Sequence, residues 1–375
     1  MVNDVPTVLL VRPLPALRNL SMERYTDALA ASLRARGDLR TAETTIGPSN
    51  WARGPLAAGI DRRLTRFVRF RRHLSHQHAD IYHFTNQTQA DLATALPLQR
   101  TIVTVHDLML LRAEEDPLGF RGSWPAVRLF RWRVGHLRRV AHVACISEQT
   151  RRDVIELVGV DPARTSVIPN GIDERFQRLP AEQLGQQRPS LLPAGSSLLL
   201  HVSTGEPYKN VEGTLRTLAA LRGRGRDAVL VRVGQPLTRA QSDLADRLGL
   251  VGAIRDLGRV SDERLIELYN LADVLLFPSH YEGFGWPPLE AMACGTPVVT
   301  SQAAALLEVT GDAALHAPAD DATALANAVE SILTDPVTAD RLTTLGFERA
   351  AQYRWETTAA SFAELYQAVL TTADM

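Results

Sequence analysis

Cysteine is scarce in this sequence, which has only two in 375 residues. Cys145 and Cys294 lie far apart along the chain and form no closely spaced pair of the kind that binds a metal. Both stand among apolar residues, so we expect buried free thiols. A secreted fold that depends on disulfide bonds is therefore not expected.

An excess of charge of one sign and long hydrophobic runs are also missing. The formal net charge is -1, whereas dedicated nucleic-acid binders usually carry a basic domain or stripe. No apolar stretch is long enough to span a bilayer, and no signal-peptide pattern precedes Arg12. We expect a cytoplasmic protein that binds no nucleic acid.

Several motifs for nucleotides, nucleophiles and metals are absent. The sequence contains no Gly-x-x-x-x-Gly-Lys-Ser/Thr, no Gly-x-Ser-x-Gly and no Asp-x-Asp. A Gly-x-Gly-x-x-Ala run at Gly223–Ala228 precedes an expected strand instead of following one, so it does not predict a dinucleotide loop. His73, His76 and His78 lack cysteine or acidic companions, and we interpret them as surface residues rather than metal ligands.

Short apolar runs rich in Val, Ile and Leu alternate with segments of helical period. Such runs are typical of a parallel sheet covered on both faces, and their alternation with helices is typical of doubly wound α/β domains. The strands are expected at Thr7–Val11, Leu39–Thr44, Asp80–Phe84, Thr101–Val105, Val140–Ile146, Thr165–Ile168, Leu198–Ser203, Ala228–Val233, Ile254–Leu257, Val274–Phe277, Pro297–Thr300 and Ala314–His316. The sequence therefore predicts an α/β protein with two Rossmann-like domains.

Residues 179–197 separate the two sets of strands. This segment is rich in Pro, Gly, Gln and Ser and has neither helical nor strand period, so it is predicted to be a linker. It divides an N-terminal domain, residues 1–178, from a C-terminal domain, residues 198–354. Helices are expected after the last strand at Asp321–Thr334, Thr338–Gln352 and Trp355–Thr371.

Ligands of open parallel sheets bind beyond the carboxyl ends of the strands. Two such domains facing each other would leave a cleft lined by loops that follow strands. Three of these loops are rich in polar residues, and they are His106-Asp107, Ser203–Asn210 and Ser279–Gly285. We expect the functional residues there.

The third loop carries the strongest signal. Gly283 and Gly285 lie between Glu282 and Glu290, and a helix is expected over Pro288–Ala293. A glycine-containing loop that enters a helix presents backbone N–H groups to phosphate. A carboxylate at each end could then hold hydroxyls on both sides of a nucleotide-sugar diphosphate. The alternative is an acidic helix start and an exposed loop glutamate.

Lys209 stands just before a second helix, expected over Val211–Leu221, for which Asn210 is a good N-cap. A cation at this end does not complement the helix dipole, and a bound diphosphate would explain it. A solvated surface lysine is the alternative.

Taken together, these elements resemble those of the retaining glycosyltransferases of family 4, which have the GT-B fold. The run Glu282–Val299 (EGFGWPPLEAMACGTPVV) resembles their donor-binding motif, and Gly205–Asn210 resembles their Glu-Pro-Arg-Lys-Asn element. Further matches, in the same order as in the family, are Thr104–Leu108 with the His-Asp-Leu of mannosyltransferase-like members, Cys145–Asp153 and Val167–Asp173. The resemblance extends over about residues 80–365.

The resemblance implies a role for each matching residue. His106 would face the transferred sugar, Glu282 would hold the donor sugar's hydroxyls, and Lys209 would neutralise the diphosphate leaving group. Glu290 would bind the donor ribose. The other donor-binding residues that it implies are Gly205, Asp107, Asn210, Gly283, Phe284 and Gly285. It also implies that the final helix, about 355–375, packs on the first domain.

The implied reaction is hexosyl transfer with retention, without a metal or other cofactor. In retaining members the leaving phosphate is thought to deprotonate the acceptor, so that stabilising its charge is the main demand. The His-Asp-Leu and Glu-Gly-Phe-Gly elements favour GDP-mannose over a UDP- or dTDP-sugar. The acceptor would be a saccharide, a lipid-linked molecule or another hydroxyl compound.

Two departures from the family pattern leave other functions open. Tyr208 replaces the usual arginine before the lysine, and the loop after the first strand lacks the usual glycines. Arg18 or Arg24 is a candidate for the missing positive charge on the acceptor side. A nucleotide-sugar epimerase, with His106, Glu282 and Asp107 as acid and base, is one alternative, and a non-catalytic nucleotide-sugar binder is the other.

Two arginine-rich segments suggest peripheral association with the inner face of a membrane. The first carries Arg62, Arg63, Arg66, Arg69, Arg71 and Arg72, and the second carries Arg121, Arg128, Arg131, Arg133, Arg138 and Arg139. Basic amphipathic helices can dock on anionic lipid. A solvated helix face balanced by acids elsewhere is the alternative.

Overall fold

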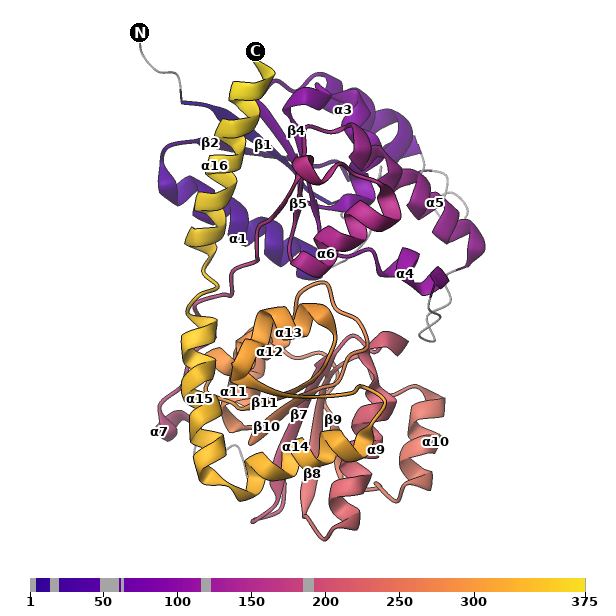
Figure 1. Cartoon of the computed structure of the whole chain (residues 1–375), viewed down its shortest axis with the longest axis vertical. Coiled ribbons are helices and arrows are strands. Elements are labelled where there is room, and N and C mark those ends of the chain that lie inside the picture. Colours follow the sequence, from indigo (N-terminus) through magenta and orange to yellow (C-terminus); the bar gives the residue numbers. More distant parts are fainter. Residues whose placement is uncertain are drawn as a thin grey trace. The chain divides into compact units, whose positions relative to one another are not determined.

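The computed structural model describes residues 5–13, 20–47, 61, 64–115, 123–184 and 192–374, which form two compact α/β units (Figure 1). Unit 1 contains the described residues up to Gly171 together with the C-terminal segment from Arg354. Unit 2 extends from Ile172 to Tyr353. Each unit is built around one six-stranded parallel sheet.

The two central strands in the sheet of unit 1 are buried along their whole length. Across the sheet, the strands are β2 (Arg40–Thr44), β1 (Thr7–Val11), β3 (Ile81–Phe84), β4 (Thr101–Val105), β5 (His142–Cys145) and β6 (Thr165–Val167). Every residue of β3 and β4 is buried, whereas β2 at the edge alternates between exposed and covered residues. Full burial of central strands requires side chains that are apolar or hydrogen-bonded on both faces.

The sheet of unit 2 has the same size and the same parallel arrangement. Its strands, in order, are β12 (Ala314–Ala317), β11 (Val298–Ser301), β10 (Val274–Phe277), β7 (Ser197–Ser203), β8 (Ala228–Gly234) and β9 (Ile254–Asp256). All twelve strands that the sequence predicts are present, each within two residues of its predicted ends. The prediction of an α/β fold with two Rossmann-like sheets is confirmed.

Helices and short 3₁₀ or π turns, the latter labelled η, connect the strands of unit 1. They are α1 (Leu20–Arg36), η2 (Thr65–Phe70), α3 (Arg71–Ser75), η3 (Gln87–Ala95), η4 (Leu98–Arg100), α4 (Met109–Glu115), α5 (Trp124–Val134), η5 (Gly135–Arg139), α6 (Glu148–Asp153), η6 (Val154–Val158), η7 (Pro162–Arg164) and α16 (Trp355–Ala373). Ser147 begins α6 as a side-chain N-cap, accepting from the Thr150 amide.

The connections of unit 2 show the same local rules. They are α7 (Ala181–Leu184), η8 (Pro207–Lys209), α9 (Val211–Gly223), α10 (Arg239–Arg247), α11 (Asp262–Leu271), α12 (Trp286–Ala293), α13 (Ala304–Thr310), η9 (Gly311–Ala313), α14 (Ala322–Thr334) and α15 (Pro336–Ala350). Thr238 and Gln241 form a reciprocal capping box at the start of α10. Asp321 and Asp335 cap α14 and α15 through their carboxylates.

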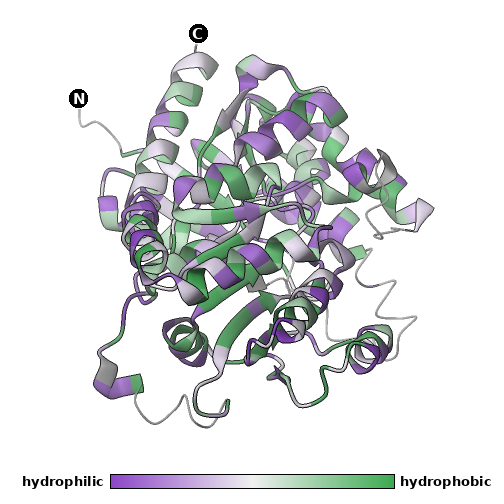
Figure 2. Cartoon of the chain, turned by 60° about the horizontal axis from the view of Figure 1, so that its bottom comes forward, coloured by the Kyte–Doolittle hydropathy of each residue, from purple (hydrophilic) through white to green (hydrophobic). Residues whose placement is uncertain are grey.

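Hydropathy divides the helices from the strands. Figure 2 shows strands that are mostly green, whereas the helices alternate green with purple along their length. In unit 2 the strands and the inner faces of α9 and α14 form one apolar cluster, which includes Leu199, Leu218, Leu230 and Val329. This packing explains why one-sided helices flank fully apolar strands.

The C-terminal helix α16 belongs to unit 1. The hydroxyl of Tyr366 lies 2.7 Å from His83 Nδ1, and the Phe362 ring centroid lies 4.7 Å from that of His83. Trp355 packs on Tyr25 of α1 at 5.6 Å between ring centroids. Helix α16 therefore completes the core of a unit whose other elements precede residue 172.

The chain passes from unit 1 to unit 2 before the predicted linker begins. The sequence places the end of the N-terminal domain at residue 178, whereas the first unit ends at Gly171. Residues after Gly171 already bind within unit 2, because the Ile172 amide donates to the Tyr353 carbonyl at 3.0 Å and Arg175 pairs with Asp262 at 2.9 Å. The predicted linker itself contains the short helix α7 and the first residue of β7.

We expect acid to destabilise the fold through its buried histidines. Burial lowers the pKa of His83 and His201 to about 3 and that of His106 to about 4, against an ordinary value of 6.5. Below pH 6.5 the unfolded chain binds protons that the folded chain does not. The free energy of unfolding then falls with pH by about 1.4 kcal/mol per unit for each such histidine, until the folded pKa is reached.

Denaturant titrations between pH 7.5 and 5 measure this slope. His106→Gln should reduce the slope by the contribution of one histidine, about 1.4 kcal/mol per pH unit. His76→Gln on the surface serves as the matched control. An equal slope in His106→Gln and in the wild type would contradict the assignment of a neutral, buried His106.

Candidate active site

The turn after β7 is fixed by Asn210. This residue has a left-handed backbone, with φ of 54°, and is the only non-glycine residue with positive φ in the described part of the chain. Its side-chain oxygen accepts from the Gly213 amide at 2.9 Å, and its amide group donates to the carbonyls of Pro278 and Ala319 at 3.0 and 2.8 Å. Asparagine suits such a position because it tolerates this conformation and caps the helix that follows. Asn210 thus ties the start of α9 to the loop after β10.

Lys209, directly before Asn210, forms an ion pair with Glu282. Its Nζ lies 2.7 and 2.9 Å from the two carboxylate oxygens, and the two side chains are 15% and 9% exposed. The same ammonium lies 5.1 Å from the ring centroid of Tyr208 and 5.7 Å from that of Phe277. Lys209 is the only lysine among the 375 residues, whose other cationic side chains are 40 arginines. The structure therefore gathers a cation, a carboxylate and two aromatic faces at the ends of β7 and β10.

The loop that carries Glu282 leads into α12. Gly285, at the N-cap, has φ of 127°, and a Cβ there would lie 2.9 Å from Leu306 Cδ2, so this position requires glycine. As a glycine, this N-cap residue supplies no side-chain hydrogen bond to the helix. Phe284 is buried, with its ring edge-on to Tyr353 at 5.6 Å. The loop therefore leads from Glu282 into the start of α12, which carries partial positive charge.

Glu290 lies one turn inside α12, where it is 6% exposed. The hydroxyl of Tyr269 on α11 donates to Glu290 Oε2 at 2.8 Å. Phe176 packs on the Tyr269 ring at 5.9 Å. This contact gives the Glu290 carboxylate a defined orientation.

His106 stands at the carboxyl end of β4 in unit 1. Its Nε2 lies 2.9 Å from the Thr85 carbonyl, to which it must donate, and its buried Nδ1 has no hydrogen-bond partner among the described residues. The Tyr25 ring packs edge-on to the imidazole at 4.6 Å. Because burial lowers its pKa to about 4, the ring is neutral at pH 7 and Nδ1 presents a lone pair.

The remaining predicted residues of unit 1 are placed as follows. The Asp107 carboxylate accepts from the amide of Met109, the first residue of α4, at 3.1 Å, while its carbonyl accepts from Gln87 at 2.9 Å. Arg24 lies half-buried on α1. Arg18 lies outside the described residues. The structure thus pairs Lys209 with Glu282 in unit 2, where Asn210 binds the loop after β10 and Glu290 lies on α12, and it places His106 and Asp107 in unit 1.

Two family models match this chain in succession. "Glycosyltransferase Family 4" matches residues 22–176, and "Glycosyl transferases group 1" matches residues 185–349. The O-antigen chain mannosyltransferase B of Escherichia coli is 32% identical over 269 residues, which are 69% of this chain and 68% of that protein. The chain belongs to glycosyltransferase family 4.

Other relatives of this family 4 member carry different names. D-inositol 3-phosphate glycosyltransferase 2 of Catenulispora acidiphila is 32% identical over 240 residues, covering 59% of this chain and 54% of that protein. The match therefore spans about half the length of that relative. HepE of Anabaena, solved with UDP and glucose, superposes with a TM-score of 0.76 at 18% identity and covers 97% of this chain and 100% of its own. That likeness establishes the GT-B fold.

Family membership favours a transferase over a nucleotide-sugar epimerase, because both family models describe glycosyl transferases. In the described ranges, no group of three or more His, Cys, Asp or Glu side chains is arranged to hold a metal ion. Nor does any helix in these ranges combine the length and apolarity needed to cross a membrane.

Several site contacts could not be read from the sequence of this family 4 chain. The Tyr269 hydroxyl comes from a helix whose apolar spacing marks it only as a core residue. The Thr85 carbonyl that orients His106 is a backbone group and leaves no signal in the sequence. Tyr208, which stands where the family usually has arginine, contributes a ring against Lys209 and a carbonyl that accepts from the His280 amide at 2.8 Å.

Proposed function

We propose that this chain is a retaining, metal-independent hexosyltransferase that moves a mannose-type sugar from GDP-mannose onto a hydroxyl acceptor. The observation that carries the proposal is the contact between Lys209 and Glu282, whose loop leads into α12. The mannosyltransferase among its relatives supports mannose as the sugar. A saccharide, a lipid-linked molecule or another hydroxyl compound would be the acceptor.

The Lys209–Glu282 pair offers two groups with different roles, a cation that can bind phosphate and a carboxylate that can bind sugar hydroxyls. A diphosphate carries more negative charge than one carboxylate, so it competes effectively for the Lys209 ammonium. As the diphosphate takes over Lys209, Glu282 becomes able to accept hydrogen bonds from the donor sugar's hydroxyls. The start of α12 adds partial positive charge beside the phosphates.

Transfer then needs no protein nucleophile and no metal. The bond between the anomeric carbon and the phosphate oxygen breaks, and the bond to the acceptor oxygen forms on the same face of the sugar. The proton of the acceptor hydroxyl passes to the leaving phosphate oxygen. Lys209 and the partial positive charge at the start of α12 stabilise the charge that develops on the diphosphate.

His106 would serve as a hydrogen-bond acceptor in this reaction. Its Nε2 proton is committed to the Thr85 carbonyl, so Nδ1, which is buried in this structure, is the ring atom whose lone pair would accept from a sugar hydroxyl once that atom becomes accessible. Its neutral state at pH 7 preserves that lone pair. Arg24 and Arg18 remain candidates on the acceptor side.

A nucleotide panel tests the donor half directly. We expect GDP to raise the Tm more than UDP, dTDP or ADP, since a ligand at a hundredfold excess over its Kd stabilises by about 2.7 kcal/mol. Incubation with GDP-mannose and acceptor should release GDP, resist EDTA and give a product whose anomeric configuration by NMR equals that of the donor. A response to UDP alone would replace GDP-mannose by a UDP-sugar, and no response to any nucleotide would contradict the proposal.

Tyr269→Phe is expected to weaken GDP binding about fivefold, because Glu290 loses the hydroxyl that orients it and one hydrogen bond to a carboxylate is worth about 1 kcal/mol or more. The turnover number should change little. Tyr366→Phe is the matched control, since it removes another buried tyrosine hydroxyl, the one that contacts His83 in unit 1. Isothermal titration with GDP should show the loss in Tyr269→Phe alone, and equal affinities in both variants would contradict this role of Glu290.

A further inference from the structure

Exposed apolar side chains gather on one part of unit 1. The described residues include ten large apolar side chains that are exposed, and six of these lie on or beside η2 and α5. They are Leu64, Phe67, Val68, Trp124, Leu129 and Trp132. Exposed apolar residues scattered singly are ordinary, but a cluster of this kind marks an interaction surface.

Helices η2 and α5 meet at this surface. The Phe67 ring centroid lies 6.4 Å from that of Trp132, and Trp124 is 66% exposed at the start of α5. Three other residues of α5 face inward, because Val127, Phe130 and Val134 are buried in the core of unit 1. The helix is therefore amphipathic, and its outer face carries tryptophan where a solvated helix would carry polar residues.

Arginine accompanies the aromatic side chains. Residues 123–140 contain five arginines and no aspartate or glutamate, and residues 64–79 contain four arginines and no acid. The Arg128 guanidinium lies 4.4 Å from the Trp124 ring centroid. Arg66, the one buried arginine of the second group, pairs with the buried Asp91 beneath the surface. Within these two segments every formally charged side chain is thus an arginine.

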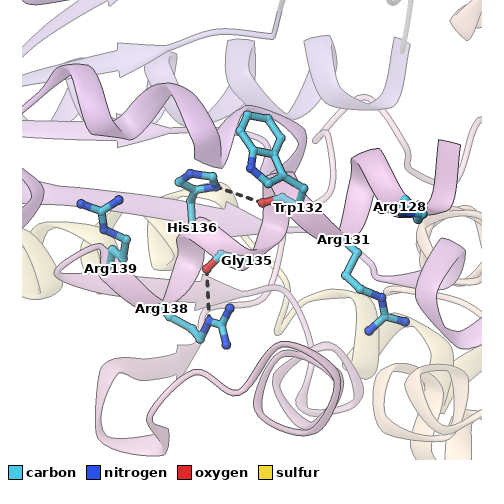
Figure 3. A pocket seen from close by; sticks show the side chains of 7 residues that line it. All are labelled: Arg128, Arg131, Trp132, Gly135, His136, Arg138 and Arg139. Atoms are coloured by element: carbon cyan, nitrogen blue, oxygen red, sulfur yellow. Dashed lines mark hydrogen bonds between the residues drawn. The ribbon is translucent and has the colours of Figure 1, made fainter. Parts of the chain in front are cut away.

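An open hollow lies at the end of α5, where it passes into η5. It has a volume of about 470 Å³, and its lining includes Arg128, Arg131, Trp132, His136, Arg138 and Arg139. Figure 3 shows these side chains around the hollow, with His136 bonded to the Trp132 carbonyl and Arg138 bonded to the Gly135 carbonyl. Such a lining suits an anion the size of a phosphate ester, because guanidinium groups recognise phosphate geometry.

We propose that this basic aromatic face, made of η2, α5 and η5, docks on the surface of an anionic lipid bilayer. The rings of Trp124 and Trp132 enter the headgroup level, and the arginines of the hollow hold a lipid phosphate. Tryptophan is enriched at membrane–water interfaces, and basic side chains near an anionic surface add to the binding. A soluble polyanion would use the arginines but gain nothing from exposed Leu64, Val68 and Leu129, so the apolar cluster favours a bilayer.

Vesicle sedimentation of the full chain tests this proposal independently of the donor reaction. Vesicles of phosphatidylcholine with phosphatidylglycerol should bind the protein, and vesicles of phosphatidylcholine alone should not. Arg131→Ala, Arg138→Ala and Arg139→Ala combined should weaken partitioning about 100-fold, which is about fivefold for each arginine. Trp124→Ser with Trp132→Ser should weaken it at least tenfold.

Matched controls lie outside the face. Arg152→Ala removes another exposed arginine of unit 1, and Val337→Ser removes an apolar side chain that is 75% exposed in unit 2. Both should bind vesicles as the wild type does. Circular dichroism and the GDP-induced shift in Tm verify that the face variants remain folded.

Three outcomes would overturn the proposal. The first is no binding of the wild type to anionic vesicles, and the second is vesicle binding by the face variants equal to that of the controls. The third is full vesicle binding by the tryptophan variant together with equally strong competition by heparin, which would identify a general polyanion surface instead of a lipid-docking face.

Discussion

Replacing Lys209 by alanine is expected to lower kcat/KM for the nucleotide sugar by about 10²- to 10³-fold, the usual effect of removing one group that stabilises transition-state charge. Most of the loss should appear in kcat, because the charge on the diphosphate grows as the sugar leaves. GDP affinity should fall as well, but by a smaller factor. Steady-state kinetics with GDP-mannose and titration with GDP separate the two effects.

Matched variants define what the Lys209→Ala result means. Arg216→Ala removes another cation of unit 2, on α9 and only 3.9 Å from Glu212, and is expected to stay within twofold of the wild type. Lys209→Arg restores the charge but not the compact ammonium that fits between the Glu282 carboxylate and two rings, so we expect partial recovery. Full activity in Lys209→Ala would show that the leaving group is stabilised elsewhere.

Glu282→Ala is expected to lower kcat/KM for the nucleotide sugar by about 100-fold while leaving GDP binding equal or tighter. The carboxylate is proposed to hold the donor sugar, which GDP lacks, and its removal frees Lys209 for the diphosphate. The test is a loss in kcat/KM without a loss in GDP affinity. Parallel weakening of both would mean that Glu282 only positions Lys209.

A double-mutant cycle sharpens this second prediction. Lys209 and Glu282 are in direct contact, so the losses of Lys209→Ala and Glu282→Ala should not add in the double variant. Glu290→Gln gives a comparison at a second carboxylate, on α12, which accepts from the Tyr269 hydroxyl. Additive losses for Lys209 and Glu282 would contradict the coupling.

The fold could be predicted from the sequence because most strands of both units, though not the edge strands β2 and β9, are apolar runs bounded by turn residues. Thr101–Val105 and Val274–Phe277 agree with the prediction to the residue, since both are buried along their whole length and rich in β-branched or apolar residues. The residue at which the chain passes from unit 1 to unit 2 was harder to predict. Composition marks residues that avoid helix and strand, but hydrogen bonds decide which unit a segment joins, and Ile172 and Arg175 already bind in unit 2.

Of the candidate site, only the residues that stand in recognisable motifs could be predicted. Glu282, Glu290, Lys209 and Asn210 stand in short runs with recognisable spacing. Their contacts are non-local, because Lys209 reaches Glu282 across 73 residues and Tyr269 reaches Glu290 across 21. Spacing along one chain does not encode such distances, and neither the Tyr269 hydroxyl nor the bare Nδ1 of His106 had any signature.

The single lysine has a consequence for proteolysis. An endoproteinase that cleaves only after lysine finds one bond in these 375 residues, the bond between Lys209 and Asn210. On one side of that bond the Lys209 side chain is paired with the carboxylate of Glu282, and on the other the Asn210 side chain donates to the carbonyls of Pro278 and Ala319. The rate at which the native chain is cleaved into fragments 1–209 and 210–375 would therefore measure how often this turn opens. A bound nucleotide would lower that rate.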